Sequence, residues 1–135
     1  GEKKVDALRD NLLRISPFAS LQMHFSRVTP DNIMLLFSTC DVVVEAFDEA
    51  SEKNMIIEEM SAQLPQIPVV AASGLAGWGN SEKLKVTRSG NLYICGDETS
   101  EVSDELPPLA PKVKIVSNLQ ADLVLEILLR DWYEN

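Results

Sequence analysis

Hydrophobic positions along this chain switch between helical and strand-like spacing. Residues 2–15 place their apolar side chains on one broad stripe at helical spacing. Pro17 ends this predicted helix, because the residue before a proline avoids helical backbone angles. Residues 20–28 then alternate between apolar and polar, which predicts a strand with one half-exposed face.

The middle of the chain continues this order of helix and strand. Residues 29–31 (Thr-Pro-Asp) form a helix start with an N-cap, a first-turn proline and an acidic residue. The valine-rich run 41–47 predicts a buried parallel strand, followed by a helix over 49–63 and an apolar strand over 67–72. This order predicts an α/β fold with a mostly parallel sheet and flanking helices.

The last third of the chain departs from this order. After the glycine-rich loop 73–80, short strands over 83–87 and 91–95 predict a small antiparallel pair near residues 83–95, with a turn at Ser89-Gly90. The stretch 97–108 is acidic and ends in prolines, and its part 97–105 is expected to be a solvated loop. The last helix, at about 112–132, is apolar over much of its surface and is expected to pack deeply.

The composition limits the classes of function. A chain of 135 residues with 45% apolar residues fits a single globular domain over 1–135. Its 21 acidic and 12 basic residues give a net charge of -9, which disfavours binding to nucleic acid. There is no long apolar run for a membrane span and no apolar signal-peptide core, so we expect no membrane partner and a cytoplasmic location.

The cysteines and the histidine form no metal-binding pattern. Cys40 and Cys95 are far apart in the sequence, no C-x-x-C pair is present, and His24 is the one histidine. We therefore expect no zinc ligands and interpret both cysteines as buried thiols in a reducing compartment. A disulfide between them stays an open alternative.

Three loops follow predicted strands, where ligands bind in parallel α/β sheets, at 27–29, 47–49 and 72–79. Asp48 could bind Mg²⁺ or a ribose, or could simply cap the helix that follows it. The glycine loop does not have the G-x-G-x-x-G spacing of a phosphate loop, so its glycines either make turns or admit a peptide backbone. The residues alone indicate a nucleotide-type α/β domain of unknown task.

Three stretches in order resemble the ThiF/MoeB/HesA family of ubiquitin-activating-like adenylyltransferases. They are Asp-Val-Val-Val-Glu-Ala-Phe-Asp at 41–48, Pro-Val-Val-Ala-Ala-Ser-Gly-Leu-Ala-Gly at 68–77, and Leu-Ala-Pro-Lys-Val-Lys-Ile-Val-Ser-Asn-Leu-Gln-Ala at 109–121. The sequence is most similar to the short ThiF-like branch of thiamine biosynthesis. The resemblance implies the C-terminal portion of a Rossmann-like domain, with two N-terminal βα units missing.

The resemblance also implies an activity. Family members use ATP and Mg²⁺ to adenylate the C-terminal Gly-Gly carboxylate of a ubiquitin-like sulfur carrier such as ThiS. On this basis Lys4, in a G-x-x-K helix start, and Arg27 bind the nucleotide, and Asp48 is the catalytic residue that serves Mg²⁺ and the reacting carboxylate. The glycines placed where the carrier tail approaches are Gly74, Gly77 and Gly79.

The sequence departs from the family pattern in two ways. The family's Asp-x-x-Asp-Asn motif reads Glu-Ala-Phe-Asp-Glu at 45–49, and the family's glycine-rich nucleotide loop lies upstream of this chain. In the family, two further strands lie between the strands expected here at 21–27 and 42–47. Without them, either the strands at 21–27 and 42–47 pair directly with each other, or another chain fills the gap in the sheet. We expect a homodimer, and an isolated chain that is inactive.

Two other classes of function stay open. The first is a non-catalytic module of the same fold that binds a partner or dimerises. The second is a fragment of a Rossmann-like oxidoreductase, which the absence of any catalytic base or hydride site in the sequence argues against.

Overall fold

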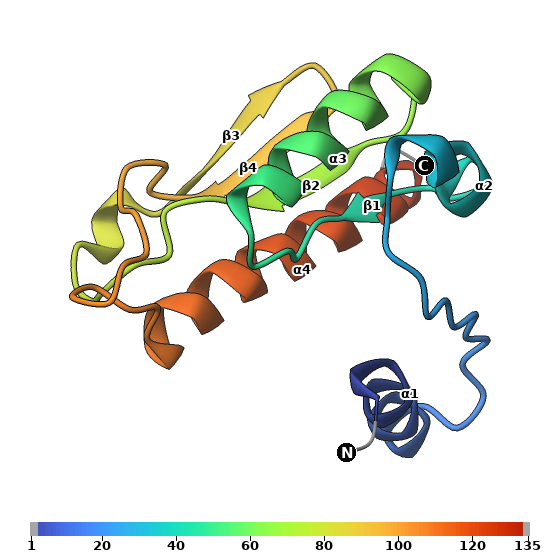
Figure 1. Cartoon of the computed structure of the whole chain (residues 1–135), viewed down its shortest axis with the longest axis horizontal. Helices are drawn as coiled ribbons and strands as arrows, with labels where there is room; N and C mark the ends of the chain where they lie inside the picture. Colours follow the sequence, from blue (N-terminus) through green and yellow to red (C-terminus); the bar gives the residue numbers. More distant parts are fainter. Residues whose placement is uncertain (1–2, 134–135) are drawn as a thin grey trace.

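The computed structural model describes residues 3–133, which form a four-stranded sheet between helices (Figure 1). The strand order is β1-β2-β4-β3. β1 (Val43–Val44), β2 (Val69–Ala72) and β4 (Leu92–Gly96) are parallel, whereas β3 (Lys85–Ser89) is antiparallel to β4. This confirms the predicted α/β fold, a mostly parallel sheet with one antiparallel pair.

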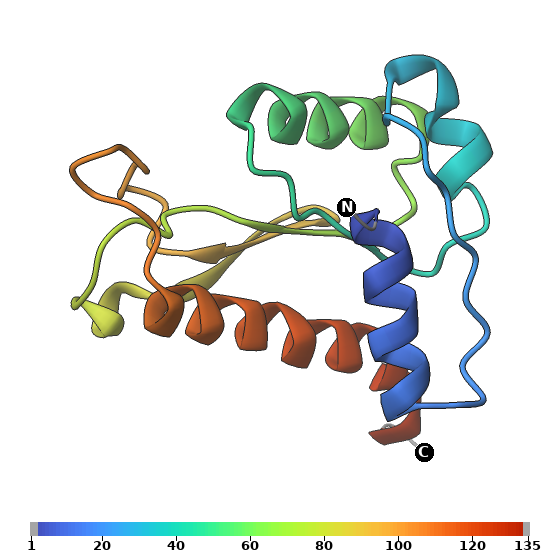
Figure 2. The same cartoon turned by 60° about the horizontal axis from the view of Figure 1, so that its bottom comes forward.

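Four α-helices lie within residues 3–133. They are α1 (Lys4–Ile15), α2 (Ile33–Phe37), α3 (Ala50–Gln63) and α4 (Ala110–Tyr133), with short 3-10 turns η1 (Pro30–Asn32) and η2 (Ser81–Lys83). Figure 2 shows α3 and α4 on opposite sides of the sheet. The predicted helix start is confirmed, because the Thr29 N–H donates to Asn32 Oδ1 at 2.9 Å in a capping box. No helix within residues 3–133 is both long and apolar enough to cross a membrane.

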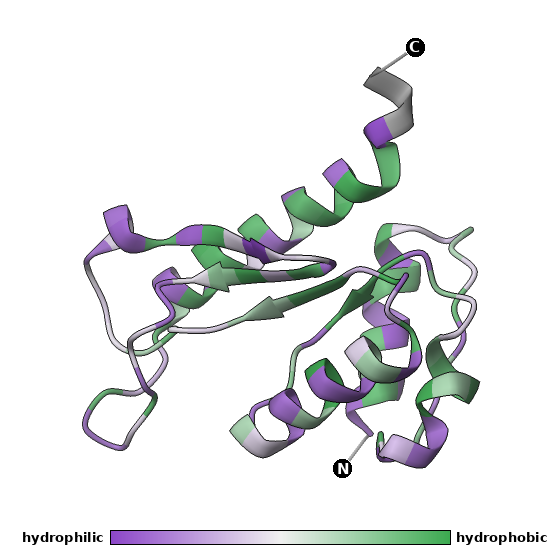
Figure 3. Ribbon diagram, turned by 90° about the horizontal axis from the view of Figure 1, so that it is seen from above, coloured by the Kyte–Doolittle hydropathy of each residue, from purple (hydrophilic) through white to green (hydrophobic). Residues whose placement is uncertain are grey.

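The core lies in two halves, because alternate residues of β2 point to opposite faces. Val69 packs toward α3 with Ile56 and Met60. On the other face, Val70 packs toward α4 with Cys95 and Val116. The hydrophobic colouring of the central strands in Figure 3 follows this burial. Each fully buried aliphatic side chain contributes about 1.5–3 kcal/mol, so these two layers fix the sheet between its helices.

The two cysteines differ in burial. Cys95 is fully buried, as predicted, and burial raises the pKa of its thiol. Cys40 is only half-buried, and both cysteines are free thiols. The alternative of a disulfide is therefore not found.

The predicted strand at 20–28 is wrong. No residue between 16 and 42 is in a strand, and Phe18 and Phe25 are 99% and 69% exposed. Alternating side chains make a strand only beside a ladder partner, and this segment runs away from the sheet (Figure 1). The alternative in which it closes directly on the 42–47 strand is therefore wrong as well.

The strand predicted at 41–47 is shorter than expected. β1 keeps two residues, Val43 opposite Val69 and Val44 opposite Val70, and lies at one edge of the sheet. The hairpin predicted near 83–95 is confirmed, but its two-residue loop is Gly90-Asn91, one residue later than expected. Gly90 has a φ of 59°, as such a tight loop requires.

Two helices expose apolar side chains. None of the α1 side chains is fully buried, and Leu8 and Ile15 are 57% and 82% exposed. The expectation that the last helix packs deeply over much of its surface is right for one face only. α4 buries Val116 and Leu123 against the sheet but leaves Leu125 more than half exposed.

Candidate functional site

The carboxyl ends of the three parallel strands gather polar side chains at one edge of the sheet. Glu45 follows β1, Ser73 follows β2, and Asp97 follows β4. Crevices at this edge are where parallel α/β sheets bind ligands. Two polar clusters lie there, the Glu45 cluster (Glu45, Lys53 and the Ala72 carbonyl) and the Asp97 network described below.

The Glu45 cluster is built around a buried carboxylate. Glu45 is 1% exposed, and its Oε1 accepts the Phe47 N–H at 2.6 Å. Its Oε2 is buried and accepts no hydrogen bond from the described residues. Lys53 Nζ lies 3.6 Å from that oxygen and donates to the Ala72 carbonyl at 2.5 Å. A charge at this depth needs a partner, and the Lys53 ammonium is the ion-pair partner of Glu45.

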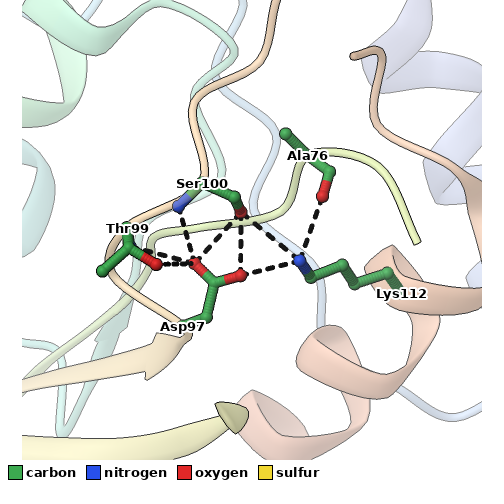
Figure 4. Close-up of polar contacts among 5 residues, drawn as sticks. All are labelled: Ala76, Asp97, Thr99, Ser100 and Lys112. Atoms are coloured by element: carbon green, nitrogen blue, oxygen red, sulfur yellow. Dashed lines mark hydrogen bonds and ion pairs between the residues drawn. The ribbon is translucent and has the colours of Figure 1, made fainter. Parts of the chain in front are cut away.

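The Asp97 network joins three distant segments of the chain (Figure 4). Lys112 Nζ, in the first turn of α4, donates to Asp97 Oδ2 at 2.7 Å and to the Ala76 carbonyl at 3.0 Å. It also lies 3.4 Å from Ser100 Oγ. Asp97 Oδ1 accepts the N–H groups of Thr99 at 2.9 Å and Ser100 at 2.8 Å. The network therefore ties the glycine loop, the segment after β4 and α4 to one ion pair.

The protonation of Asp97 follows from these contacts. Burial alone would raise the pKa of this carboxyl. The Lys112 ammonium and the hydrogen bonds from Ser100 and Thr99 outweigh burial and hold the pKa well below its ordinary value. Asp97 is thus a carboxylate at neutral pH.

Asp48 lies between β1 and α3 with an exposed carboxylate. The N-cap of α3 is Glu49, and no side chain caps the helix, so the alternative in which Asp48 is a capping residue is not found. Within residues 3–133 the Asp48 carboxylate makes no hydrogen bond or ion pair. It is open to a ligand, and its catalytic and metal-binding roles stay predictions.

Arg27 borders a cavity beside the first turns of α3. The cavity has a volume of about 350 Å³ and is lined by residues 27–30 with Ser51, Glu52 and Met55. This volume is in the range of small-molecule sites. Arg27 is exposed and pairs with Glu52 at 2.9 Å, so it stands at the rim of the cavity.

Lys4 is not brought to this site. It is exposed on α1, which lies apart from the sheet in Figure 1. Gly1 and Glu2, which begin the predicted G-x-x-K motif, lie outside the described residues. The nucleotide-binding role of Lys4 stays a prediction that this arrangement of α1 does not support.

The three predicted tail-binding glycines all have positive φ angles, of 69° to 78°. A Cβ at Gly74 would lie 2.0 Å from Asp97 Oδ1, and one at Gly77 would lie 2.7 Å from Leu106 Cδ1. Gly79 faces open space. Gly74 and Gly77 are therefore required by close packing, whereas Gly79 is required only by its backbone angle.

The segment that packs on these glycines is the acidic stretch 97–108. Its prediction as a solvated loop is wrong at its start, because Asp97 is buried in the ion pair with Lys112. The middle of the stretch is exposed, as predicted. The Gly77 N–H donates to the Pro107 carbonyl at 3.0 Å, which closes the far end of the stretch over the glycine loop.

A metal at this edge would depend on few protein ligands. No group of three or more histidine, cysteine, aspartate or glutamate residues in the described part of the chain could hold a metal ion. Mg²⁺ is commonly held by one or two carboxylates together with substrate phosphates. An exposed Asp48 beside a bound nucleotide fits that pattern.

Sequence reasoning missed Lys53, Asp97 and Lys112. One signal was available, because both lysines lie in the first turn of a helix, where the macrodipole disfavours a cation. The signal is weak by itself, because Lys4 also lies in the first turn of a helix and is exposed.

The fold and this edge define a Rossmann-like α/β domain of the nucleotide-binding type. The chain belongs to the ThiF family, whose model matches residues 1–135. This confirms the resemblance. A comparison with curated proteins finds no significant match.

Solved structures show the same fold. The Escherichia coli tRNA N6-threonylcarbamoyladenosine dehydratase TcdA in complex with AMP has a TM-score of 0.80 at 16% identity, over all of this chain and 68% of TcdA. A structure of TcdA (CsdL) gives 0.80 at 14% identity, and the E. coli TcdA complex with ATP gives 0.73 at 15% identity, with the same coverage. At these identities the likeness establishes the fold.

Proposed function

We propose that this chain is part of an ATP-dependent adenylyltransferase that activates the C-terminal Gly-Gly carboxylate of a ThiS-like sulfur carrier in thiamine biosynthesis. The observation that carries the proposal is the family match over residues 1–135. The AMP and ATP complexes of the similar TcdA structures support a nucleotide as the co-substrate.

The residues divide the task along the carboxyl edge of the sheet. Asp48 would hold Mg²⁺, which neutralises phosphate charge when it is bound. Arg27 and the cavity of about 350 Å³ beside it offer room for part of the nucleotide. The glycine loop would bind the extended carrier tail, with room for it at Gly79, which faces open space, whereas Gly74 and Gly77 are packed beneath residues 97–108.

The charge of the chain favours a protein carrier over a tRNA substrate. TcdA is named for a tRNA nucleoside, but a net charge of -9 provides little of the basic surface that a phosphate backbone requires. A short neutral peptide tail needs no such surface. We also propose that the chain forms a homodimer and that it is located in the cytoplasm. The exposed apolar side chains of α1 and α4 support the homodimer.

The carrier tail tests this proposal against a non-catalytic binding module. The chain is titrated in a calorimeter with a ThiS-like carrier, and then with the same carrier lacking its last two glycines. Adenylation requires the tail in the site, so the shortened carrier is expected to bind with an affinity at least about tenfold lower. Equal affinities would favour the binding module, which recognises the folded body of its partner.

A further inference from the structure

One ammonium group spans the carboxyl ends of two neighbouring parallel strands. Lys53 Nζ contacts the carbonyl of Ala72, the last residue of β2, and the carboxylate of Glu45, which directly follows β1. It therefore lies at the carboxyl ends of β1 and β2. Asp48 is in the same connection between β1 and α3.

The two lysine–carboxylate pairs at this edge differ in how many of the lysine N–H donors already have partners. Lys112 has partners for all three N–H groups, and its side chain is 6% exposed. Lys53 has one hydrogen bond within the described residues, to Ala72, and its side chain is 22% exposed. A lysine ammonium has three donors, so the partly exposed Lys53 keeps donors that a ligand at this edge of the sheet can reach.

Glu45 has the geometry of a residue that holds this lysine. Its side chain is fully buried, so a ligand cannot reach it, and its Oε1 is fixed by the Phe47 N–H. Its Oε2 faces Lys53 at 3.6 Å without a hydrogen bond. A lysine held by a glutamate in this way contacts nucleotide phosphates in protein kinases, where the ion pair fixes the ammonium in place.

We propose that Lys53 binds a phosphate oxygen of the nucleotide and that Glu45 is its positioning residue. The identity of the ligand as a nucleotide rests on the proposed function, whereas the phosphate-binding geometry rests on the Glu45 cluster. The ammonium acts as a point charge on the phosphate, as lysines commonly do.

The test compares AMP, adenosine and inorganic tripolyphosphate as probes. Lys53→Met is expected to weaken the binding of AMP and tripolyphosphate roughly tenfold or more, which is the effect of losing a hydrogen bond between charged groups. Adenosine, which has no phosphate, is expected to bind both proteins equally. Lys114→Met, at an exposed position on α4, is the matched control and should bind all three probes as the unchanged chain does.

A second measurement does not depend on the variant folding. Lysine side chains of the unchanged chain are acylated and mapped by mass spectrometry, with and without tripolyphosphate. Tripolyphosphate is expected to slow the labelling of Lys53 several-fold and to leave Lys114 unchanged. Equal labelling of Lys53 with and without the probe would overturn the proposal.

The outcomes separate this inference from the proposed function. Unchanged AMP affinity in Lys53→Met, together with carrier binding that needs the Gly-Gly tail, would overturn the phosphate site alone. Phosphate binding through Lys53, together with carrier binding that ignores the tail, would support the phosphate site and contradict carrier activation. A chain that binds neither AMP nor tripolyphosphate would overturn the phosphate site.

Discussion

At the scale of single residues, the carboxyl edge combines buried charges that hold the structure with charges left open to ligands. Asp97 and Lys112 satisfy each other and are sealed from solvent. Asp48 is exposed and unpaired within residues 3–133, and Lys53 is paired but reachable. Substitution of Asp97 or Lys112 should therefore mainly lower stability, whereas substitution of Asp48 or Lys53 should weaken ligand binding.

Lys112→Met should be strongly destabilising. It leaves the Asp97 carboxylate buried without its counter-ion, which typically costs about 3–5 kcal/mol of unfolding free energy. Urea unfolding measures the loss, and Lys114→Met on the same helix should change stability by less than about 0.5 kcal/mol. Similar stabilities for the two variants would show that the ion pair does not hold the loops.

Asp97 should make stability depend on acid pH. Because its folded pKa is lowered, its contribution is complete above the unfolded pKa of about 3.9 and is lost as the pH falls toward the folded pKa. Asp97→Asn should therefore be less stable than the unchanged chain at about pH 6, and the difference should narrow below about pH 4. Urea unfolding across this range measures the difference, and a constant gap would contradict the lowered pKa.

Asp48→Asn should leave folding intact and affect ligand binding. Its side chain is exposed and has no partner in the described chain, so the free energy of unfolding should change by less than about 0.5 kcal/mol. The Mg²⁺-dependent part of ATP binding should fall, because the amide is a poor replacement for a carboxylate ligand. Thermal unfolding without Mg-ATP measures the stability of the variant, and thermal unfolding with Mg-ATP measures its binding. If Mg-ATP stabilises the variant as much as the unchanged chain, Asp48 is not a metal ligand.

At the scale of elements, the glycine loop and the segment 97–108 behave as one packed unit. Gly74→Ala would place a Cβ 2.0 Å from Asp97 Oδ1 at a positive φ, so it should cost clearly more than the roughly 1–2 kcal/mol of the backbone angle alone. Gly79→Ala has the same angle but open space, and should cost only that amount. Urea unfolding compares the two, and equal losses would mean that the loops are not packed together.

Local patterns predicted the elements whose partners are near or buried. The runs that became α3, β2 and the β3–β4 hairpin carry their own periodicity and turn residues, so the sequence was sufficient for them. The strand expected at 20–28 failed because a strand also needs a neighbour, and the edge of β1 provides none to that segment.

The candidate site was less predictable than the fold. Asp48 could be placed from its position after a strand, but the burial of Asp97 depends on Lys112, fifteen residues later. The pairing of Glu45 with Lys53 likewise depends on where α3 begins relative to β1. Such contacts are set by packing between elements, which local periodicity does not contain.

At the scale of the whole molecule, the chain is a ThiF-family domain with polar chemistry at one edge and exposed apolar side chains elsewhere. Its charge of -9 disfavours nucleic acid, and Gly79 in its glycine loop faces open space. The central claim is that one edge of the sheet serves both a nucleotide and the carboxylate of a carrier.

Coupling between the two ligands tests that claim most directly. The chain is titrated with Mg-ATP alone and when saturated with the Gly-Gly carrier, and then with the carrier in the absence and presence of Mg-ATP. Two ligands that meet at one site should change each other's affinity by the same factor in both directions, about fivefold or more. Affinities that are independent of each other would contradict a shared site at this edge and with it the proposed adenylation.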